Sequence, residues 1–178
     1  MAQAHQRIIR PHPRLRPHIS GIHPGRWGLA LVEAVLGYLW LVSALNKLLN
    51  AQFRRGLARV LQGQLKDNPN HWWVALVKGL VLPHAQVWAA LVQVGELLVA
   101  LGYVAGALLW LRGWFPHKRW TRRLNGAVVL ALLGGAVMTA NYYLMAGNTV
   151  PWLEPSMPYK EGLSIDGVAT LLALALVV

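Results

Sequence analysis

The sequence predicts an all-α fold: a four-helix transmembrane bundle with interfacial amphipathic helices between the first and second spans. Three observations predict it. Of the 178 residues, 56% are hydrophobic and 13% are charged, whereas soluble domains carry about a quarter charged residues. Apolar runs long enough to cross a bilayer alternate with basic segments, and the mean hydropathy is +0.40. The segment after the first run is amphipathic rather than uniformly apolar, as is typical of helices that lie in the membrane interface.

We expect the four spans at residues 27–49, 86–111, 124–146 and 162–178. The last run is short for a hydrocarbon core of about 30 Å. We therefore expect either that its helix begins near Tyr159 or that the sequence stops short of the true terminus. Residues 27–178 form the expected membrane domain, and residues 1–26 form a basic arm rich in Arg, His and Pro. The arm lacks an apolar segment and apolar periodicity, so we expect neither a cleavable signal nor independent folding.

Residues 50–85 predict two amphipathic helices. Apolar side chains recur at helical spacing, and basic side chains form another face of the first helix. The stretch 67–70, Asp-Asn-Pro-Asn, is expected to stop that helix and to cap the next one, which runs until Pro83. These helices either cap the bundle or offer a docking surface to a partner subunit. The docking candidates, two of which lie in the arm, are Arg55, Arg59, Trp73, Arg14 and Arg16.

The charge distribution predicts orientation. The formal net charge is +11, but the basic residues bracket apolar runs, which favours anionic headgroups and topology signals over nucleic acid. Five Arg residues lie in the arm and five basic residues lie at 112–123, whereas only Lys160 separates the third and fourth spans. By the positive-inside rule we expect a multi-pass protein of a prokaryotic plasma (inner) membrane with both termini in the cytoplasm.

Small residues predict close packing of the second and third spans. Gly102 and Gly106 form a GxxxG pair, and Gly95 is expected on the same face. The third span repeats small residues every four positions, from Ala127 to Thr139. Such stripes let helix backbones approach closely in lipid.

Ionisable side chains lie inside the predicted spans. Glu96 is in the apolar stretch VQVGELLVALGYVAG, and a charge at the centre of a lipid-facing helix costs roughly 3 kcal/mol or more. Such residues usually face the bundle interior and pair there, and Lys47 and the tyrosines are among the available partners. They form either a structural polar network or a site for protons or a quinone headgroup. The candidates are Glu96, Glu33, Asn141, Tyr103 and Asp166.

The residue inventory limits the cofactors. The chain has no Cys, and all seven His residues lie outside the predicted spans, with His84 nearest to one. Intramembrane haem or pigment usually needs an axial imidazole, so we expect no such cofactor bound by this chain alone. We find no phosphate loop, zinc signature or Ser/His/Asp set, and we assign no catalytic or metal-binding residue.

Several stretches resemble the DoxX/DoxD family over about residues 27–178. They are WLVSALNKL, NPNHWWVALVKGLVLPHAQVWAALVQVGELLVALGYVAGAL, ANYYLMAGN and SIDGVATLLALAL. The resemblance implies a small four-helix membrane protein, and DoxD is a subunit of archaeal thiosulfate:quinone oxidoreductase. Glu33, Trp40 and the basic arm depart from the family pattern.

The expected function is that of a non-catalytic integral-membrane subunit of a respiratory or photosynthetic electron-transfer complex, with a quinone contact as a refinement. The alternative is a DoxD-like subunit of a quinone-linked oxidoreductase. The expected partners are membrane lipids and other subunits of a membrane redox complex, and no nucleic acid.

Overall fold

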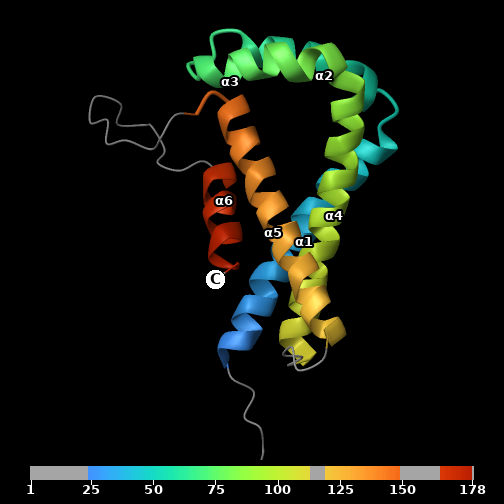
Figure 1. Cartoon of the computed structure of the whole chain (residues 1–178), viewed down its shortest axis with the longest axis vertical. Coiled ribbons are helices and arrows are strands. Elements are labelled where there is room, and N and C mark those ends of the chain that lie inside the picture. The colour runs from blue at the N-terminus through green and yellow to red at the C-terminus, as the bar shows by residue number, and fades with distance from the viewer. Residues whose placement is uncertain (1–23, 113–118, 149–164, 178) are drawn as a thin grey trace, which may run out of the picture.

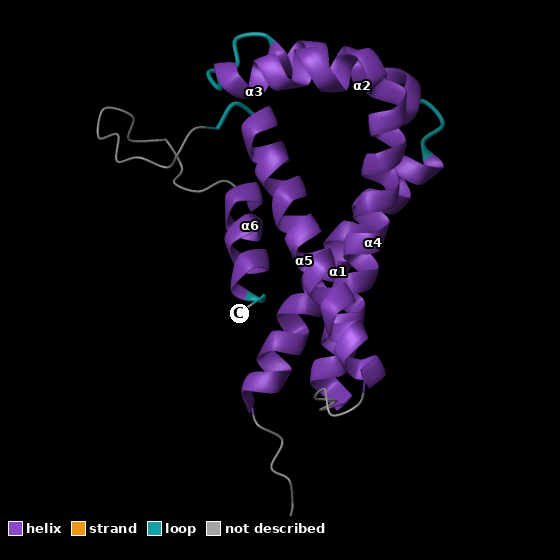
Figure 2. Cartoon of the chain, in the orientation of Figure 1, coloured by secondary structure: helices purple, strands orange, loops and turns teal. Residues whose placement is uncertain are grey.

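The computed structural model describes residues 24–112, 119–148 and 165–177, and this part of the chain is helical without strands (Figures 1 and 2). The α-helices are α1 (Pro24–Leu49), α2 (Phe53–Leu65), α3 (His71–Leu76), α4 (Ala85–Arg112), α5 (Arg119–Met145) and α6 (Ile165–Ala175). A π-helix, η1 (Val77–Val81), and a 3₁₀ turn, η2 (Leu82–His84), join α3 to α4. The predicted all-α class is confirmed for these residues.

Among the described residues, three helical runs are long and apolar enough to cross a membrane. They cover residues 25–49, 71–112 and 123–145. The predicted fourth span begins in residues outside the described part, and its described helix α6 has 11 residues. At 1.5 Å per residue such a helix covers about 16 Å, roughly half of a hydrocarbon core. Four crossings therefore remain a prediction.

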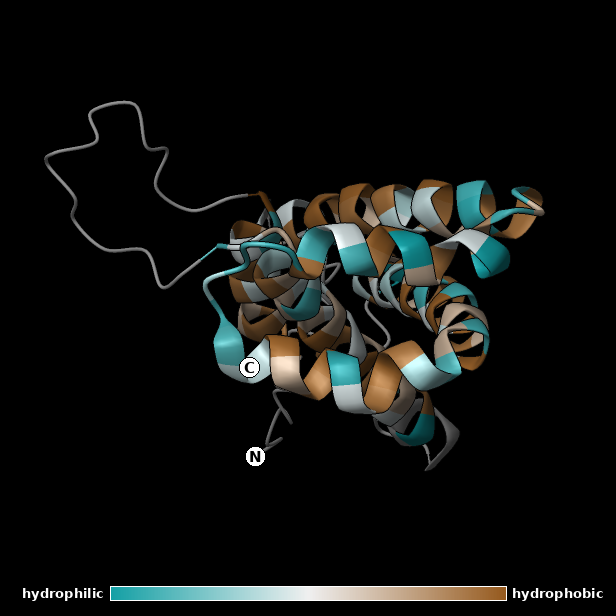
Figure 3. Ribbon diagram, turned by 90° about the horizontal axis from the view of Figure 1, so that it is seen from above, coloured by the Kyte–Doolittle hydropathy of each residue, from teal (hydrophilic) through white to brown (hydrophobic). Residues whose placement is uncertain are grey.

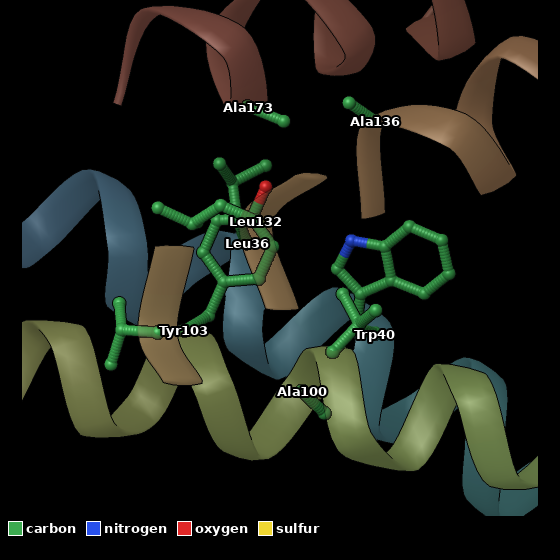
Figure 4. Close-up of a cluster of buried hydrophobic side chains, with 9 residues drawn as sticks. Leu36, Trp40, Ala100, Tyr103, Leu132, Ala136 and Ala173 are labelled. Atoms are coloured by element: carbon green, nitrogen blue, oxygen red, sulfur yellow. The ribbon is translucent and has the colours of Figure 1, made fainter. Parts of the chain in front are cut away.

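The core lies where α1, α4 and α5 meet (Figure 4). α1 packs along α4, while α5 packs between α4 and α6. Trp40, which lies deep in the first predicted span, is 7% exposed and belongs to this core. The other buried members are Leu36, Val99, Ala100, Tyr103, Val128, Leu132, Ala136 and Ala173.

The small residues allow the close approach that the sequence predicted, but they face two different neighbours. A Cβ atom at Gly102 would overlap the Cβ of Ala131 on α5, and one at Gly95 would lie 3.3 Å from the sulfur of Met138. Gly106 instead faces α1, where a Cβ would overlap the carboxyl group of Glu33. The expected single glycine face is thus divided between α5 and α1.

Residues 53–84, here called the lateral segment, run across one end of the long helices (Figure 1). Leu61 and Leu65 of α2 pack against Trp73 and Val77 in a second apolar cluster. The chain turns into α4 at η2, which contains Pro83, because proline cannot donate the backbone hydrogen bond that a continuing helix needs. The indole of Trp88 donates to the carbonyl of Leu80 at 3.2 Å and satisfies an acceptor at this bend.

The Asn-Pro-Asn turn caps α5 rather than α3. Asn70 is the N-cap of α3 but makes no side-chain capping hydrogen bond, which corrects the sequence-based expectation. Its side-chain amide instead donates to the carbonyl of Asn148 at 2.9 Å, and that of Asn68 donates to the carbonyl of Leu144 at 2.9 Å. The last carbonyls of a helix lack intrahelical partners. The Asn68 amide donates to those of Leu144 and Met145, and the Asn70 amide also donates to that of Leu144 at 3.3 Å, so the turn ties the lateral segment to α5.

The N-terminal end of α1 lies at the end of the molecule opposite the lateral segment, as do the end of α4 and the start of α5 (Figure 1). The described helix ends that flank the arm and the basic loop therefore lie at one end of the molecule, while residues 1–23 and 113–118 lie outside the described part. Arg14 and Arg16 lie outside the described residues. The side of the membrane and the membrane type remain predictions.

Candidate functional site: a polar centre between α1, α4 and α5

Glu96 lies at the centre of a buried hydrogen-bond network and is 0% exposed. The Nζ atom of Lys47, on α1, lies 2.6 Å from Oε1 and 2.8 Å from Oε2 of the carboxylate. The hydroxyl group of Tyr142, on α5, donates to Oε1 at 2.5 Å. Three helices that are separate in sequence therefore converge on one carboxylate.

Ser43 completes the α1 side of the centre. It precedes Lys47 by one helical turn, so both side chains lie on the same face of α1. Lys47 donates to the Ser43 hydroxyl at 2.7 Å, and that hydroxyl donates to Oε2 of Glu96 at 3.2 Å. The ammonium group also lies 5.7 Å from the ring centroid of Tyr142 and 5.9 Å from that of Phe53. Hydrogen bonds, the ion pair and cation–π contacts thus compensate the desolvation of Lys47.

Gln93 links the centre to the lateral segment. It lies one turn before Glu96 on α4 and is 3% exposed. Its amide nitrogen donates to the backbone carbonyl of Lys47 at 2.6 Å, close to the C-terminus of α1, and its oxygen accepts from Nε of Arg54 at 2.7 Å. We call Ser43, Lys47, Gln93, Glu96 and Tyr142 together the polar centre.

Glu33 forms a separate buried site. It is 2% exposed, and its Oε1 accepts a hydrogen bond from the indole of Trp110 at 3.2 Å. Within the described part of the chain, its Oε2 has no hydrogen-bond partner. Glu33 precedes Lys47 by 14 residues on α1, which corresponds to about 21 Å along the helix axis. The two acids therefore do not share a site.

The remaining candidates are distributed over the molecule. Tyr103 is 1% exposed in the apolar core. Asn141 accepts from the indole of Trp73 at 3.2 Å and helps to hold the lateral segment on α5. Asp166 lies in the first turn of α6, where its backbone carbonyl accepts a hydrogen bond from the hydroxyl group of Thr170 at 2.8 Å. Among the described residues, the hydrogen-bond partners of Glu96 are Ser43, Lys47 and Tyr142 and do not include Tyr103, Asn141 or Asp166, so the polar centre shares only Glu96 with the predicted set.

The docking candidates also differ in position. Arg55 and Arg59 are exposed on α2, as expected. Trp73 is 4% exposed and packs against Leu61 and Leu65. The expectation that Trp73 lies on a docking surface is therefore corrected: burying its indole stabilises the contact between α2, α3 and α5.

Sequence reasoning named Lys47 and the tyrosines as partners for the acids but missed Ser43, Gln93 and Arg54. Two of them could have been found from helical spacing: Ser43 lies four residues before Lys47, and Gln93 lies three residues before Glu96. In the described part of the chain, no three His, Asp or Glu side chains gather as metal ligands.

No family model, curated protein or solved structure matches this chain. The fold and the site define the class directly: the residues that the structure describes are helical, three of their helices are of membrane-crossing length, and a buried, ion-paired polar centre lies between these helices.

Proposed function

We propose that this chain is a non-catalytic membrane subunit of an electron-transfer complex and that its polar centre contacts a quinone headgroup. One observation carries the proposal. A carboxylate, an ammonium group and a phenol converge within 2.5–2.8 Å between membrane-length helices, while 23% of the Lys47 side chain remains exposed. Ionisable groups inside membrane helices are costly and commonly mark substrate or proton pathways.

The chemistry of a quinone fits these groups. Its carbonyl oxygens accept hydrogen bonds, and its reduction consumes two electrons and two protons. In this proposal the partner oxidoreductase supplies the electrons. When the quinone binds, one of the three Lys47 N–H groups turns from Oε2 of Glu96 to a quinone carbonyl, while Oε1 of Glu96 and Ser43 hold the ammonium group in position. The chain thus orients the headgroup and supplies a hydrogen-bond donor.

A DoxD-like subunit of a quinone-linked oxidoreductase is the more specific version of this function. One observation favours it: the segments that resemble the family supply the residues of the polar centre. Ser43 and Lys47 lie in WLVSALNKL, Glu96 lies in GELL, and Tyr142 lies in ANYYLMAGN. The residues that carry the resemblance therefore meet around one carboxylate.

Two measurements on the complex from native membranes test the proposal. The tagged chain, extracted in a mild detergent, should copurify with redox subunits, and a photoreactive quinone should label peptides that contain Lys47 or Tyr142. Glu96→Gln should slow quinone turnover of the assembled complex, with Glu33→Gln as the control because Glu33 lies in a separate site. A chain that purifies alone, or labelling unchanged by excess unlabelled quinone, would contradict the proposal.

A further inference from the structure

The α2 helix carries a basic face that its internal packing leaves exposed. Leu61 and Leu65 are 5% and 7% exposed because they pack against α3 and η1. Arg55, Arg59 and Lys66 are exposed; Arg55 and Arg59 lie four residues apart on one face of α2, and Lys66 is the C-cap residue that follows the helix. We call these three residues the basic face. Since the packing of α2 within the chain uses Leu61 and Leu65, this face is free to meet an anionic surface.

A stripe of apolar side chains is exposed on the adjoining helices. Trp72, Leu76 and Leu80 are 64%, 47% and 52% exposed, and they recur every four residues along α3 and η1. The turns of the π-helix η1 are wider than α-helical turns, so a four-residue spacing stays on one face there. Their neighbours Trp73 and Val77 face α2. We call the three exposed residues the apolar stripe.

Charge and position indicate what meets these surfaces. Residues 50–85 contain five Lys or Arg residues and one acidic residue, Asp67. The segment lies across the end of helices long enough to span a bilayer, and hydrophilic and hydrophobic residues alternate along it when it is seen from above (Figures 1 and 3). A cationic, Trp-bearing helical segment at the end of membrane spans has the composition of an interfacial element.

We propose that the lateral segment binds anionic phospholipid, with phosphate groups on the basic face and the upper acyl region against the apolar stripe. A phospholipid supplies both complementary chemistries, and it already surrounds the ends of the long helices. Each Lys or Arg near an anionic bilayer surface strengthens association by about fivefold. The basic face therefore gives the chain a preference for anionic over zwitterionic lipid.

Native mass spectrometry of the full chain released from nanodiscs tests this proposal. The nanodiscs contain equal amounts of phosphatidylglycerol and phosphatidylcholine. The wild-type chain should retain phosphatidylglycerol preferentially, and Arg55→Gln/Arg59→Gln/Lys66→Gln should lose about fivefold of this preference per charge removed. The matched control, Arg55→Lys/Arg59→Lys/Lys66→Arg, keeps the three charges and should retain it.

The wild-type chain also offers a test that needs no variant. Its preference for phosphatidylglycerol should fall as salt is raised, because ions screen exposed charges within about 10 Å at 0.1 M. Equal retention of both lipids by the wild type, or an unchanged preference in the glutamine variant, would overturn the proposal. So would a glutamine variant that keeps its lipids but loses a protein that copurifies with the wild type, since the basic face would then dock a subunit.

Discussion

The Nζ atom of Lys47 lies 2.6 Å from Oε1 of Glu96, and this ion pair joins α1 to α4 inside the helix interface. The pair explains how an acid is retained within an apolar membrane run. An unpaired carboxylate there would cost several kcal/mol, roughly 3 or more. Lys47, Ser43 and Tyr142 together offset that cost by direct contact with both carboxylate oxygens.

The ion pair predicts that Glu96→Gln destabilises the chain by about 3 kcal/mol. An amide preserves shape and polarity but leaves the Lys47 ammonium group without its counter-charge, and removing one partner of a buried pair typically costs about 3–5 kcal/mol. We expect the lower end of this range because 23% of the Lys47 side chain is exposed, so water partly solvates the ammonium group when its counter-charge is removed. Reversible unfolding in mixed micelles measures the loss.

The double variant Lys47→Met/Glu96→Gln is the control for this pair. It removes both charges together. Its loss in unfolding free energy should therefore be smaller, by at least about 1 kcal/mol, than the summed losses of the single variants Lys47→Met and Glu96→Gln. Additive losses would show that the two side chains do not stabilise each other.

Removal of the Tyr142 hydroxyl should lower the free energy of unfolding by about 1.5 kcal/mol, because a hydrogen bond to a charged acceptor contributes about 1.5–3 kcal/mol. Tyr142→Phe keeps the ring, which lies 6.4 Å from that of Trp40. Tyr38→Phe is the matched control, since Tyr38 is 65% exposed. Equal stability of the two variants would count against the contact between Tyr142 and Glu96.

A methyl group at Gly106 should destabilise the packing of α1 on α4. The added Cβ would overlap the Glu33 carboxyl group, and overpacking typically costs about 1–3 kcal/mol. Glu33→Ala should partly rescue Gly106→Ala, because it removes the obstructing group. Gly28→Ala is the control: it meets nothing within 4 Å, and alanine is the better helix former. Thermal unfolding in detergent compares the wild type, Gly106→Ala, Gly106→Ala/Glu33→Ala and Gly28→Ala. If the double variant is no more stable than Gly106→Ala, the steric explanation is contradicted.

Loss of the Asn68 side chain should loosen the lateral segment from α5. The amide donates to the carbonyls of Leu144 and Met145 at 2.9 and 3.3 Å, and Leu144 also accepts from the backbone of Gly147, so Asn68→Ala removes these bonds at a net cost of about 0.5–1.5 kcal/mol. Hydrogen exchange should accelerate at residues 141–148, and exposed Asn46→Ala is the control. Unchanged exchange in Asn68→Ala would show that the turn does not hold α5.

Hydrogen exchange of the wild-type chain in lipid should distinguish the long helices from the lateral segment by their degree of protection. Residues 85–112 and 123–145 should be strongly protected, because their backbone hydrogen bonds lie in helices of membrane-crossing runs. The lateral segment should be partly protected. Complete exchange of residues 85–112 would contradict their placement in the bilayer.

Much of the fold follows from local pattern. The hydropathy runs predicted helices that the structure describes within a few residues, and Pro83 marked the boundary before α4, which begins at Ala85. The pairing of Glu96 was expected in kind, since an acid in a membrane run needs a partner. Which of the available groups would meet it was not predictable, because Ser43 and Lys47 lie on α1 and Tyr142 lies on α5, and no local pattern fixes the rotation of these helices relative to α4.

The sequence by itself determined the helical class, the apolar runs, the excess of basic over acidic residues and the amphipathic character of residues 50–85, since these depend on composition and on the helical period. Tertiary structure decided which polar groups meet. It placed Asn68 and Asn70 on the end of α5, turned Gly106 toward Glu33 rather than α5, and separated Glu33 from the polar centre. These contacts join segments up to 78 residues apart, so their energy exists only once the helices have packed in one register.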